Sequence, residues 1–190
     1  MNIIQIGANK GNDDLSKIIG TTQPRKLILV EPMNLHNSDL LGHYSWVDNL
    51  FLENLVVAEE TGKEVEFYYH VDDGPGYEVA SLTKEHIYVR HPKLSYDGIK
   101  SFSVKTININ DLFDKYQLKD VDILFIDAEG YDYTILRSIN FDDYNIKKIY
   151  FENLHLKNSD IYDFLESKGY VIEKNVGTHG WSSAAEKTVP

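Results

Sequence analysis

The amino-acid sequence predicts a single α/β domain over residues 1–190, with a doubly wound, mostly parallel sheet and helices on both of its faces. Apolar runs at residues 3–6, 26–30 and 121–126 have few polar interruptions, which is typical of strands buried in a parallel sheet. Segments with a helical spacing of apolar residues lie between these runs, and this alternation indicates an α/β fold. A length of 190 residues suits one domain with a sizeable core.

The first part of the chain is expected to form four strands and two helices. After the first strand, apolar residues at helical spacing precede Gly20, which is a helix stop. The alternating residues 65–68 follow a Thr-Gly turn and indicate an edge strand. We expect strands at residues 3–6, 26–30, 52–58 and 65–68, and helices at 14–19 and 35–41.

The remainder begins with an irregular segment and then returns to alternating strands and helices. Gly and Pro interrupt the chain from Asp72 to about Gly98, so we expect a long loop there. The four runs after it read as strands, and a helical spacing of apolar residues separates them. We expect strands at residues 100–109, 121–126, 148–151 and 170–173, and helices around 111–116, 135–139 and 161–165.

Composition excludes several classes of function. The chain has 30 Asp and Glu against 19 Lys and Arg, a net charge of −11, so a nucleic-acid partner is not expected. No apolar run is long enough for a membrane span, and no cationic leader precedes the first strand. Cysteine is absent, which excludes disulfides and thiolate sites and favours a cytoplasmic location.

The turn after the first strand is the first candidate binding element. Gly7-Ala8-Asn9-Lys10-Gly11 joins a strand to a helix start, the place where ligands bind in open α/β sheets. Its glycines are four residues apart and do not form the Gly-x-Gly-x-x-Gly fingerprint of dinucleotide sites. The amide of Asn9 suits an amino-acid group better than a pyrophosphate. A tight turn without a ligand is the alternative.

Acidic residues follow several of the predicted strands. Glu31 comes twenty residues after Gly11, a separation that suits a carboxylate bound to the two hydroxyls of a ribose. Asp127 and Glu129 end another strand, and Glu152 ends the next, with His155 close behind. A single such residue is more often a solvated group or a helix cap, but agreement among strands favours a common site.

The same segments resemble the FkbM family of S-adenosylmethionine-dependent methyltransferases. The family's Asp-x-Gly-Ala-Asn-x-Gly turn is similar to Gln5–Gly11, with Gln5 in place of Asp, and its acidic residue and Pro correspond to Glu31-Pro32. The late motif Ile-Asp-x-Glu-Gly is present at residues 126–130. Looser matches occur at residues 54–62, 152–155 and 169–170. The resemblance covers residues 3–173 and implies a seven-stranded, Rossmann-like class I methyltransferase fold.

The resemblance implies S-adenosyl-L-methionine as the cofactor and assigns residues to it. The glycine turn would hold the methionyl end, Glu31 the ribose, and the segment around Val57-Ala58 the adenine, with Asp127 beside the sulfonium. Ser81, followed by a leucine, resembles a small family motif near the cofactor. The expected cofactor-binding residues are Gln5, Gly7, Ala8, Asn9, Gly11, Glu31, Pro32, Val57, Ala58, Ser81 and Asp127.

The usual reaction of the family, methylation of an oxygen, requires a base for the proton of the acceptor. His155 is our first candidate, followed by Glu129 and Asp127, because a neutral His or a carboxylate can take that proton. His155 has an equal alternative as a solvated residue, and Glu129 as the cap of a helix that starts at Tyr131. A divalent metal at Asp127 and Glu129 is the less favoured option, so no metal is assigned.

The segment around residues 70–98 is the expected acceptor-binding or lid insertion. It is rich in Tyr and His, whose rings suit a small-molecule or carbohydrate acceptor, although surface decoration is a close alternative. We leave open a homo-oligomer in which a partner chain covers the cofactor. Two other functions also stay open: a nicotinamide-dependent oxidoreductase, and a non-catalytic cofactor-binding domain of the same fold.

Overall fold

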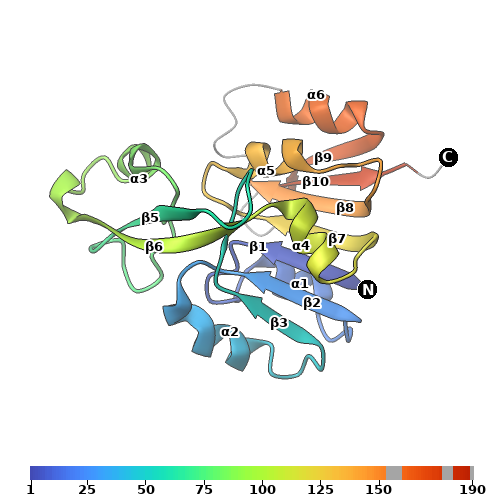
Figure 1. The fold of residues 1–190 in the computed structure, drawn as a ribbon, viewed down its shortest axis with the longest axis horizontal. Coiled ribbons are helices and arrows are strands. Elements are labelled where there is room, and N and C mark those ends of the chain that lie inside the picture. Colours follow the sequence, from blue (N-terminus) through green and yellow to red (C-terminus); the bar gives the residue numbers. More distant parts are fainter. Residues whose placement is uncertain (153–159, 177–181, 189–190) are drawn as a thin grey trace.

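The computed structural model describes residues 1–152, 160–176 and 182–188. Its main feature is a seven-stranded sheet in the order β3-β2-β1-β7-β8-β10-β9 (Figure 1). Neighbouring strands from β3 to β8 are parallel, and only β10 runs antiparallel to its neighbours. The predicted mostly parallel, seven-stranded sheet is therefore confirmed. Its strands are β1 Asn2–Ile6, β2 Lys26–Val30, β3 Leu50–Glu53, β7 Asp120–Ile126, β8 Asn145–Glu152, β9 Tyr170–Val176 and β10 Ser182–Lys187.

Helices cover both faces of this sheet because its strands carry apolar side chains on both sides. On one face, Ile3 and Leu27 pack with residues of α1 (Asp14–Ile19) and α2 (Asn37–His43), the latter preceded by the 3₁₀ turn η1 (Asn34–His36). On the other face, Ile4 and Ile28 pack with α4, α5 and α6. These helices are α4 Ile109–Lys115, α5 Asp132–Ser138 and α6 Asp160–Ser167. Alternate residues of one strand thus enter two cores.

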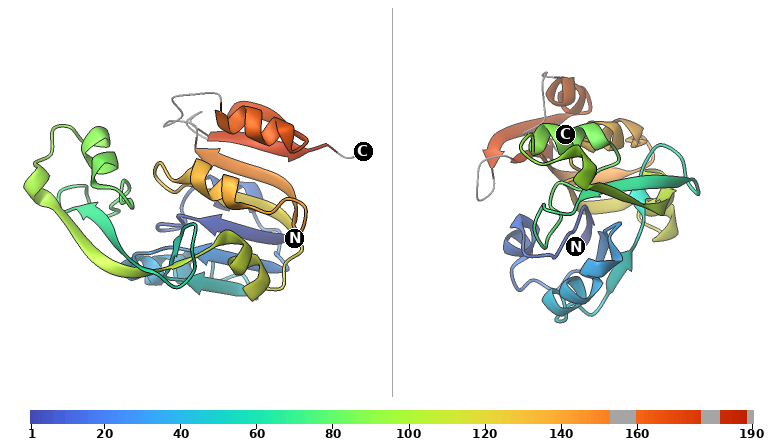
Figure 2. Two further views of the ribbon diagram at one scale, coloured as in Figure 1. Left: turned by 45° about the horizontal axis from the view of Figure 1, so that its top comes forward. Right: turned by 90° about the vertical axis from the view of Figure 1, so that its left-hand side faces the viewer.

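A second, smaller sheet projects from the carboxyl ends of the main strands. Its order is β4-β6-β5, with β4 Val56–Val57, β5 Glu64–His70 and β6 Ile99–Ile107. We call residues 64–107 the arm, since Figures 1 and 2 show β5, β6 and α3 (Lys84–Arg90) extending to one side of the main sheet. The short 3₁₀ turn η2 (Tyr96–Gly98) leads back into β6.

Three expectations about elements were wrong. The single strand expected at 52–58 is two, because Asn54 and Leu55 leave the main sheet and β4 joins β6 instead. The irregular segment contains the helix α3. Strand β10 was not expected, because its sequence Ser-Ser-Ala-Ala-Glu-Lys has little of the apolar character by which strands are recognised.

No helix in the described ranges combines the length and the apolar character that crossing a bilayer requires.

Candidate functional site

A cavity of about 590 Å³ opens where the arm faces the carboxyl ends of β1, β2, β7 and β8. Its volume is within the range of small-molecule sites. The main sheet contributes the turn after β1, residues 31–33 after β2, residues 127–129 after β7, and Glu152. The arm contributes residues 77–80 and three side chains from around α3. The cavity therefore lies at the rim that the strand ends predicted.

The turn after β1 is fixed by hydrogen bonds within the protein. The N–H groups of Gly7 and Ala8 both donate to the carbonyl of Val30, at 2.9 and 3.2 Å, and Gly11 N–H donates to the carbonyl of Ala8 at 2.9 Å. A Cβ on Gly7 would overlap the carbonyl oxygen of Asp127, so only glycine permits β1 and β7 to end this close together. The glycines of the turn thus shape the floor of the cavity.

Glu31 lies against this turn and is buried. Its Oε2 accepts from Asn9 N–H and its Oε1 from Met33 N–H, both at 2.8 Å. Burial raises the pKa of Glu31 to about 7, against the opposing effect of these two hydrogen bonds. The carboxyl is thus fixed in position, lines the cavity, and changes its protonation state near neutral pH.

The side-chain amides of Asn9 and Gln5, which were expected to bind the cofactor, donate to other parts of the protein. The Asn9 side-chain amide donates to the carbonyl of Gly76 at 2.9 Å and so joins the first turn to the arm. The Gln5 amide donates to Asp13, the N-cap of α1. Gln5 is fully buried and does not line the cavity, whereas Asp13 does.

Three carboxylates meet at the ends of β7 and β8. Asp127, Glu129 and Glu152 each place one oxygen within 4.8 Å of the others, a spacing that could hold a divalent cation. Burial raises the pKa of Asp127 well above its usual range, and the nearby carboxylates raise it further. Among the described residues, the buried Oδ1 of Asp127 has no hydrogen-bond partner. This corner therefore attracts a cationic or hydrogen-bond-donating ligand.

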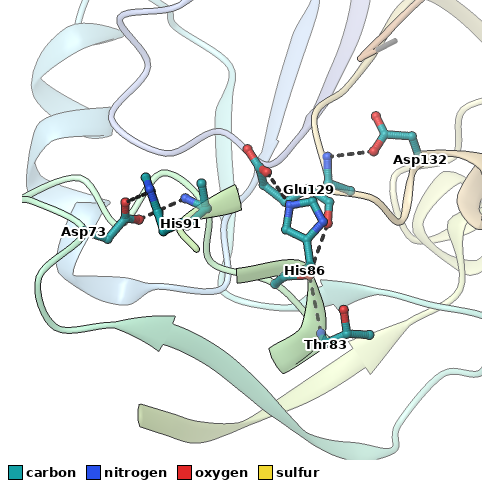
Figure 3. Close-up of polar contacts among 9 residues, drawn as sticks. Asp73, Thr83, His86, His91, Glu129 and Asp132 are labelled. Atoms are coloured by element: carbon teal, nitrogen blue, oxygen red, sulfur yellow. Dashed lines mark hydrogen bonds and ion pairs between the residues drawn. The ribbon is translucent and has the colours of Figure 1, made fainter. Parts of the chain in front are cut away.

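Glu129 connects this corner to the arm. Its carboxylate is 2.7 Å from Nε2 of His86, and Ser81 Oγ donates to its carbonyl at 3.1 Å (Figure 3). The N-cap of α5 is Tyr131, whose side chain makes no cap bond. Asp132, the first residue of α5, accepts from the N–H groups of Ala128 and Glu152, both at 3.3 Å. The capping alternative for Glu129 stays a prediction.

The arm brings a second carboxylate–imidazole pair to the cavity. His91 Nε2 lies 2.6 Å from Oδ1 of Asp73 (Figure 3). Both residues line the cavity, and so does Arg90. Sequence reasoning placed both residues in the expected acceptor-binding insertion, but it did not predict their pairing, because the segment is mixed and irregular in sequence. Only the folding of the arm over the strand ends brings them to the cavity.

Several residues with a strained backbone conformation also line this cavity. Asn9, Tyr77 and Glu129 have φ values of 42°, 47° and 45°, and all three line the cavity. They are three of the five non-glycine residues with positive φ in the described ranges. Such conformations persist only where the surrounding structure holds them, and they are common at functional sites.

Most of the predicted site residues meet in this cavity. Gln5, Ala58 and Ser81 do not line it: Gln5 and Ser81 are buried behind the surface, and Ala58 packs beside the small core of the arm. His155 lies outside the described residues, so its role stays a prediction. Glu152, which the sequence placed among the strand-end carboxylates without assigning it a role, also lines the cavity, and so does Asp13, which was not selected. The predicted residues that line it are Gly7, Ala8, Asn9, Gly11, Glu31, Pro32, Val57, Asp127 and Glu129.

Comparison with solved structures supports the class of fold. A precorrin-6y C5,15-methyltransferase from Geobacter metallireducens GS-15 superposes with a TM-score of 0.50 at 15% identity, over 98% of this chain and 80% of that one. A ribosomal protein L11 methylase from Lactobacillus delbrueckii subsp. bulgaricus gives 0.46 at 6% identity, over 98% and 70%. The first likeness concerns the fold alone, which is that of Rossmann-like class I methyltransferases.

Comparison of the sequence with known proteins and protein families identifies the family of this chain. No curated protein matches the chain. The model of the methyltransferase FkbM domain matches residues 5–172, which is most of the chain. That range includes the glycine turn, Glu31 and the carboxylates at the end of β7. The chain therefore belongs to the FkbM methyltransferase family.

Proposed function

We propose that this protein is an S-adenosylmethionine-dependent O-methyltransferase that acts on a hydroxyl of a small-molecule or carbohydrate acceptor. Membership of the family gives the reaction class. The observation that carries the proposal is that one cavity gathers the glycine turn, Glu31 and the carboxylates after β7. Ligands of open α/β sheets bind at this edge.

The residues at the end of β2 fit the nucleoside part of the cofactor. A carboxylate has about four lone-pair sites, and Glu31 uses two of them for backbone N–H groups. The others can accept the two hydroxyls of a ribose. Pro32 and Val57 line the same cavity and offer apolar surface to an adenine.

The acidic corner fits the reactive part of the cofactor. When bound, S-adenosylmethionine supplies an electrophilic methyl group on a positively charged sulfur. Asp127, Glu129 and Glu152 stabilise a cation beside them, and such a cation lowers the pKa of Asp127 toward its ordinary range. In this proposal the protein contributes position and the exclusion of water around the reacting atoms.

We assign Glu129 as the base that takes the acceptor proton, with His86 as its positioning partner. Glu129 lines the cavity, and the contact with His86 Nε2 fixes the direction of its carboxylate. A carboxylate within hydrogen-bond reach of a hydroxyl can accept its proton as the oxygen attacks the methyl group. Asp127 and His155 stay as the other candidates.

The arm is the proposed acceptor-binding insertion, as expected for residues 70–98. Tyr77 and Leu82 bring an aromatic ring and an aliphatic side chain to the cavity from this segment. An aromatic face with a hydroxyl tip suits the ring of a sugar or a small hydroxylated molecule.

Labelled cofactor tests the proposal. Purified protein is incubated with methyl-labelled S-adenosylmethionine and an extract of the source cell, and the labelled product is identified. We expect a methyl ether on a small molecule or glycan, and a loss of labelling by about 10²- to 10⁴-fold in Glu129→Gln. Labelling of nucleic acid, or of carbon or nitrogen atoms, would contradict the proposed acceptor class.

A further inference from the structure

The cavity contains one strongly basic side chain among many acidic ones. Seven of the residues that line it are Asp or Glu, and Arg90 is the only Arg or Lys among the described residues there. Arg90 ends α3, on the side of the cavity formed by the arm. A guanidinium is always charged and binds carboxylates through a planar set of donors. Its presence in an acidic cavity therefore calls for a specific partner.

Within the described ranges, Arg90 has no such partner. Its Nε is buried and makes no hydrogen bond to these residues. Asp73, which lines the same cavity, is paired with His91 at 2.6 Å. A buried donor without an acceptor is costly, and native structures rarely keep one unless something else binds it. The guanidinium is thus available to an anionic group inside the cavity.

The proposed cofactor has one anionic group, the carboxylate of its amino-acid end, and the glycine turn is poorly equipped to bind it. Four of the five N–H groups of the turn already donate within the protein, Lys10 does not line the cavity, and the Asn9 amide donates to the arm. The cavity's carboxylates favour the sulfonium and the ammonium but repel a carboxylate. The N–H groups already engaged are those of Gly7, Ala8, Asn9 and Gly11.

We propose that Arg90 binds the α-carboxylate of the methyl donor, which would make the arm part of the cofactor site as well as of the acceptor site. This inference rests on the proposed function. It assigns the amino-acid end of the cofactor to a residue from the insertion, and it leaves the turn after β1 with the role of shaping the cavity. Binding of the donor would then also hold α3 against the strand ends.

Two ligands that differ only in the amino-acid end provide the test. S-adenosylhomocysteine carries the carboxylate, whereas 5′-methylthioadenosine lacks the whole amino-acid group. Calorimetry with both ligands is carried out on the wild type, on Arg90→Gln, and on Lys93→Gln. The last variant removes one exposed positive charge from the same segment, at a position that does not line the cavity.

We expect Arg90→Gln to weaken S-adenosylhomocysteine binding by about 10- to 100-fold and to leave methylthioadenosine binding unchanged. Lys93→Gln should change neither affinity. Equal weakening of both ligands in Arg90→Gln, or no weakening of either, would overturn the role of Arg90 while leaving the proposed cofactor in place. Failure of the wild type to bind S-adenosylhomocysteine would overturn the proposed function and this inference together.

Discussion

At the scale of single residues, Glu31 is the side chain on which the proposed cofactor pose depends most. It is 5% exposed and held by two backbone N–H groups, yet burial raises its pKa to about 7. A carboxyl in this state gains from a ligand that donates hydrogen bonds to its ionised form. Sequence spacing identified Glu31, but not its contact with Asn9 N–H, which only the folded turn creates.

Replacement of Glu31 by Ala is expected to weaken the binding of S-adenosylhomocysteine at least several-fold, because the ribose loses its acceptor. Wild-type affinity should also be several-fold lower at pH 6 than at pH 8, since protonation of a group with a pKa of about 7 removes the ionised acceptor. Calorimetry at the two pH values measures both effects. The control is Glu60→Ala, an exposed residue that does not line the cavity. Unchanged affinity in Glu31→Ala would count against the pose.

Gly7 allows a comparison of two glycines with similar backbone angles. Gly7 and Gly62 have φ values of 76° and 80°, but a Cβ on Gly7 overlaps the carbonyl of Asp127, whereas one on Gly62 meets nothing within 4 Å. Gly62→Ala should cost only the backbone strain, about 1–2 kcal/mol. Gly7→Ala should cost several kcal/mol more or prevent folding. Chemical denaturation measures the two free energies of unfolding, and similar values would show that β1 and β7 do not need this close approach.

At the scale of elements, the arm is fastened to the main sheet by a few polar contacts. The Asn9 amide bonds to Gly76, His86 bonds to Glu129, and Ser81 bonds to the Glu129 carbonyl. These contacts connect segments that are distant in sequence, so spacing could not predict them. The sequence predicts a functional role for this long insertion, which stays a prediction. It did not predict α3, because Gly and Pro near the helix indicated a loop.

Asn9→Gly tests whether the side-chain amide of Asn9 holds the arm against the main sheet. Glycine keeps the positive φ of this position and removes only the amide, so the turn is preserved. We expect faster hydrogen exchange in residues 76–90, because the loop loses its bond to the first turn. Exchange in β1 and β2 should be unchanged, which provides an internal control. Identical exchange of residues 76–90 in the two proteins would show that the amide does not hold the arm.

At the scale of the whole molecule, the protein buries several carboxyl groups at one edge of its sheet. Asp132 is buried behind the cavity, and burial, followed by the charge of Glu152, raises its pKa to about 7 from 3.8. A raised pKa means that the folded state binds the proton more tightly than the unfolded state does. The protonated carboxyl of Asp132 therefore stabilises the folded state below about pH 4. Its contribution to the free energy of unfolding, about 4 kcal/mol, is lost as the pH rises through 7.

We therefore expect the free energy of unfolding of the ligand-free protein to fall between pH 5 and pH 8. Asp132→Asn should make this fall shallower, because the amide does not titrate. Urea denaturation at several pH values measures the slope. Glu60→Gln, at an exposed position, should keep the wild-type slope. A slope in Asp132→Asn equal to that of the wild type would show that Asp132 is ionised in both states.

The overall architecture was more predictable than the details of the site. The apolar runs of β1, β2 and β7 are buried on both faces, so their composition alone indicates a parallel sheet. Strand β10 is paired on both sides, but it packs through small residues such as Ala184 and Ala185, which carry little signal in sequence. Arg90 and Asp73 reach the cavity only through the tertiary fold of the arm, which no local pattern encodes.

The most direct test of the central claim is a calorimetric titration of the wild-type protein with S-adenosylhomocysteine, beside a parallel titration with NAD. The cavity at the ends of β1, β2, β7 and β8 is proposed to bind a sulfonium nucleoside. The account therefore predicts saturable one-to-one binding of S-adenosylhomocysteine and none of NAD. Absence of heat at millimolar S-adenosylhomocysteine, or tight binding of NAD instead, would contradict it.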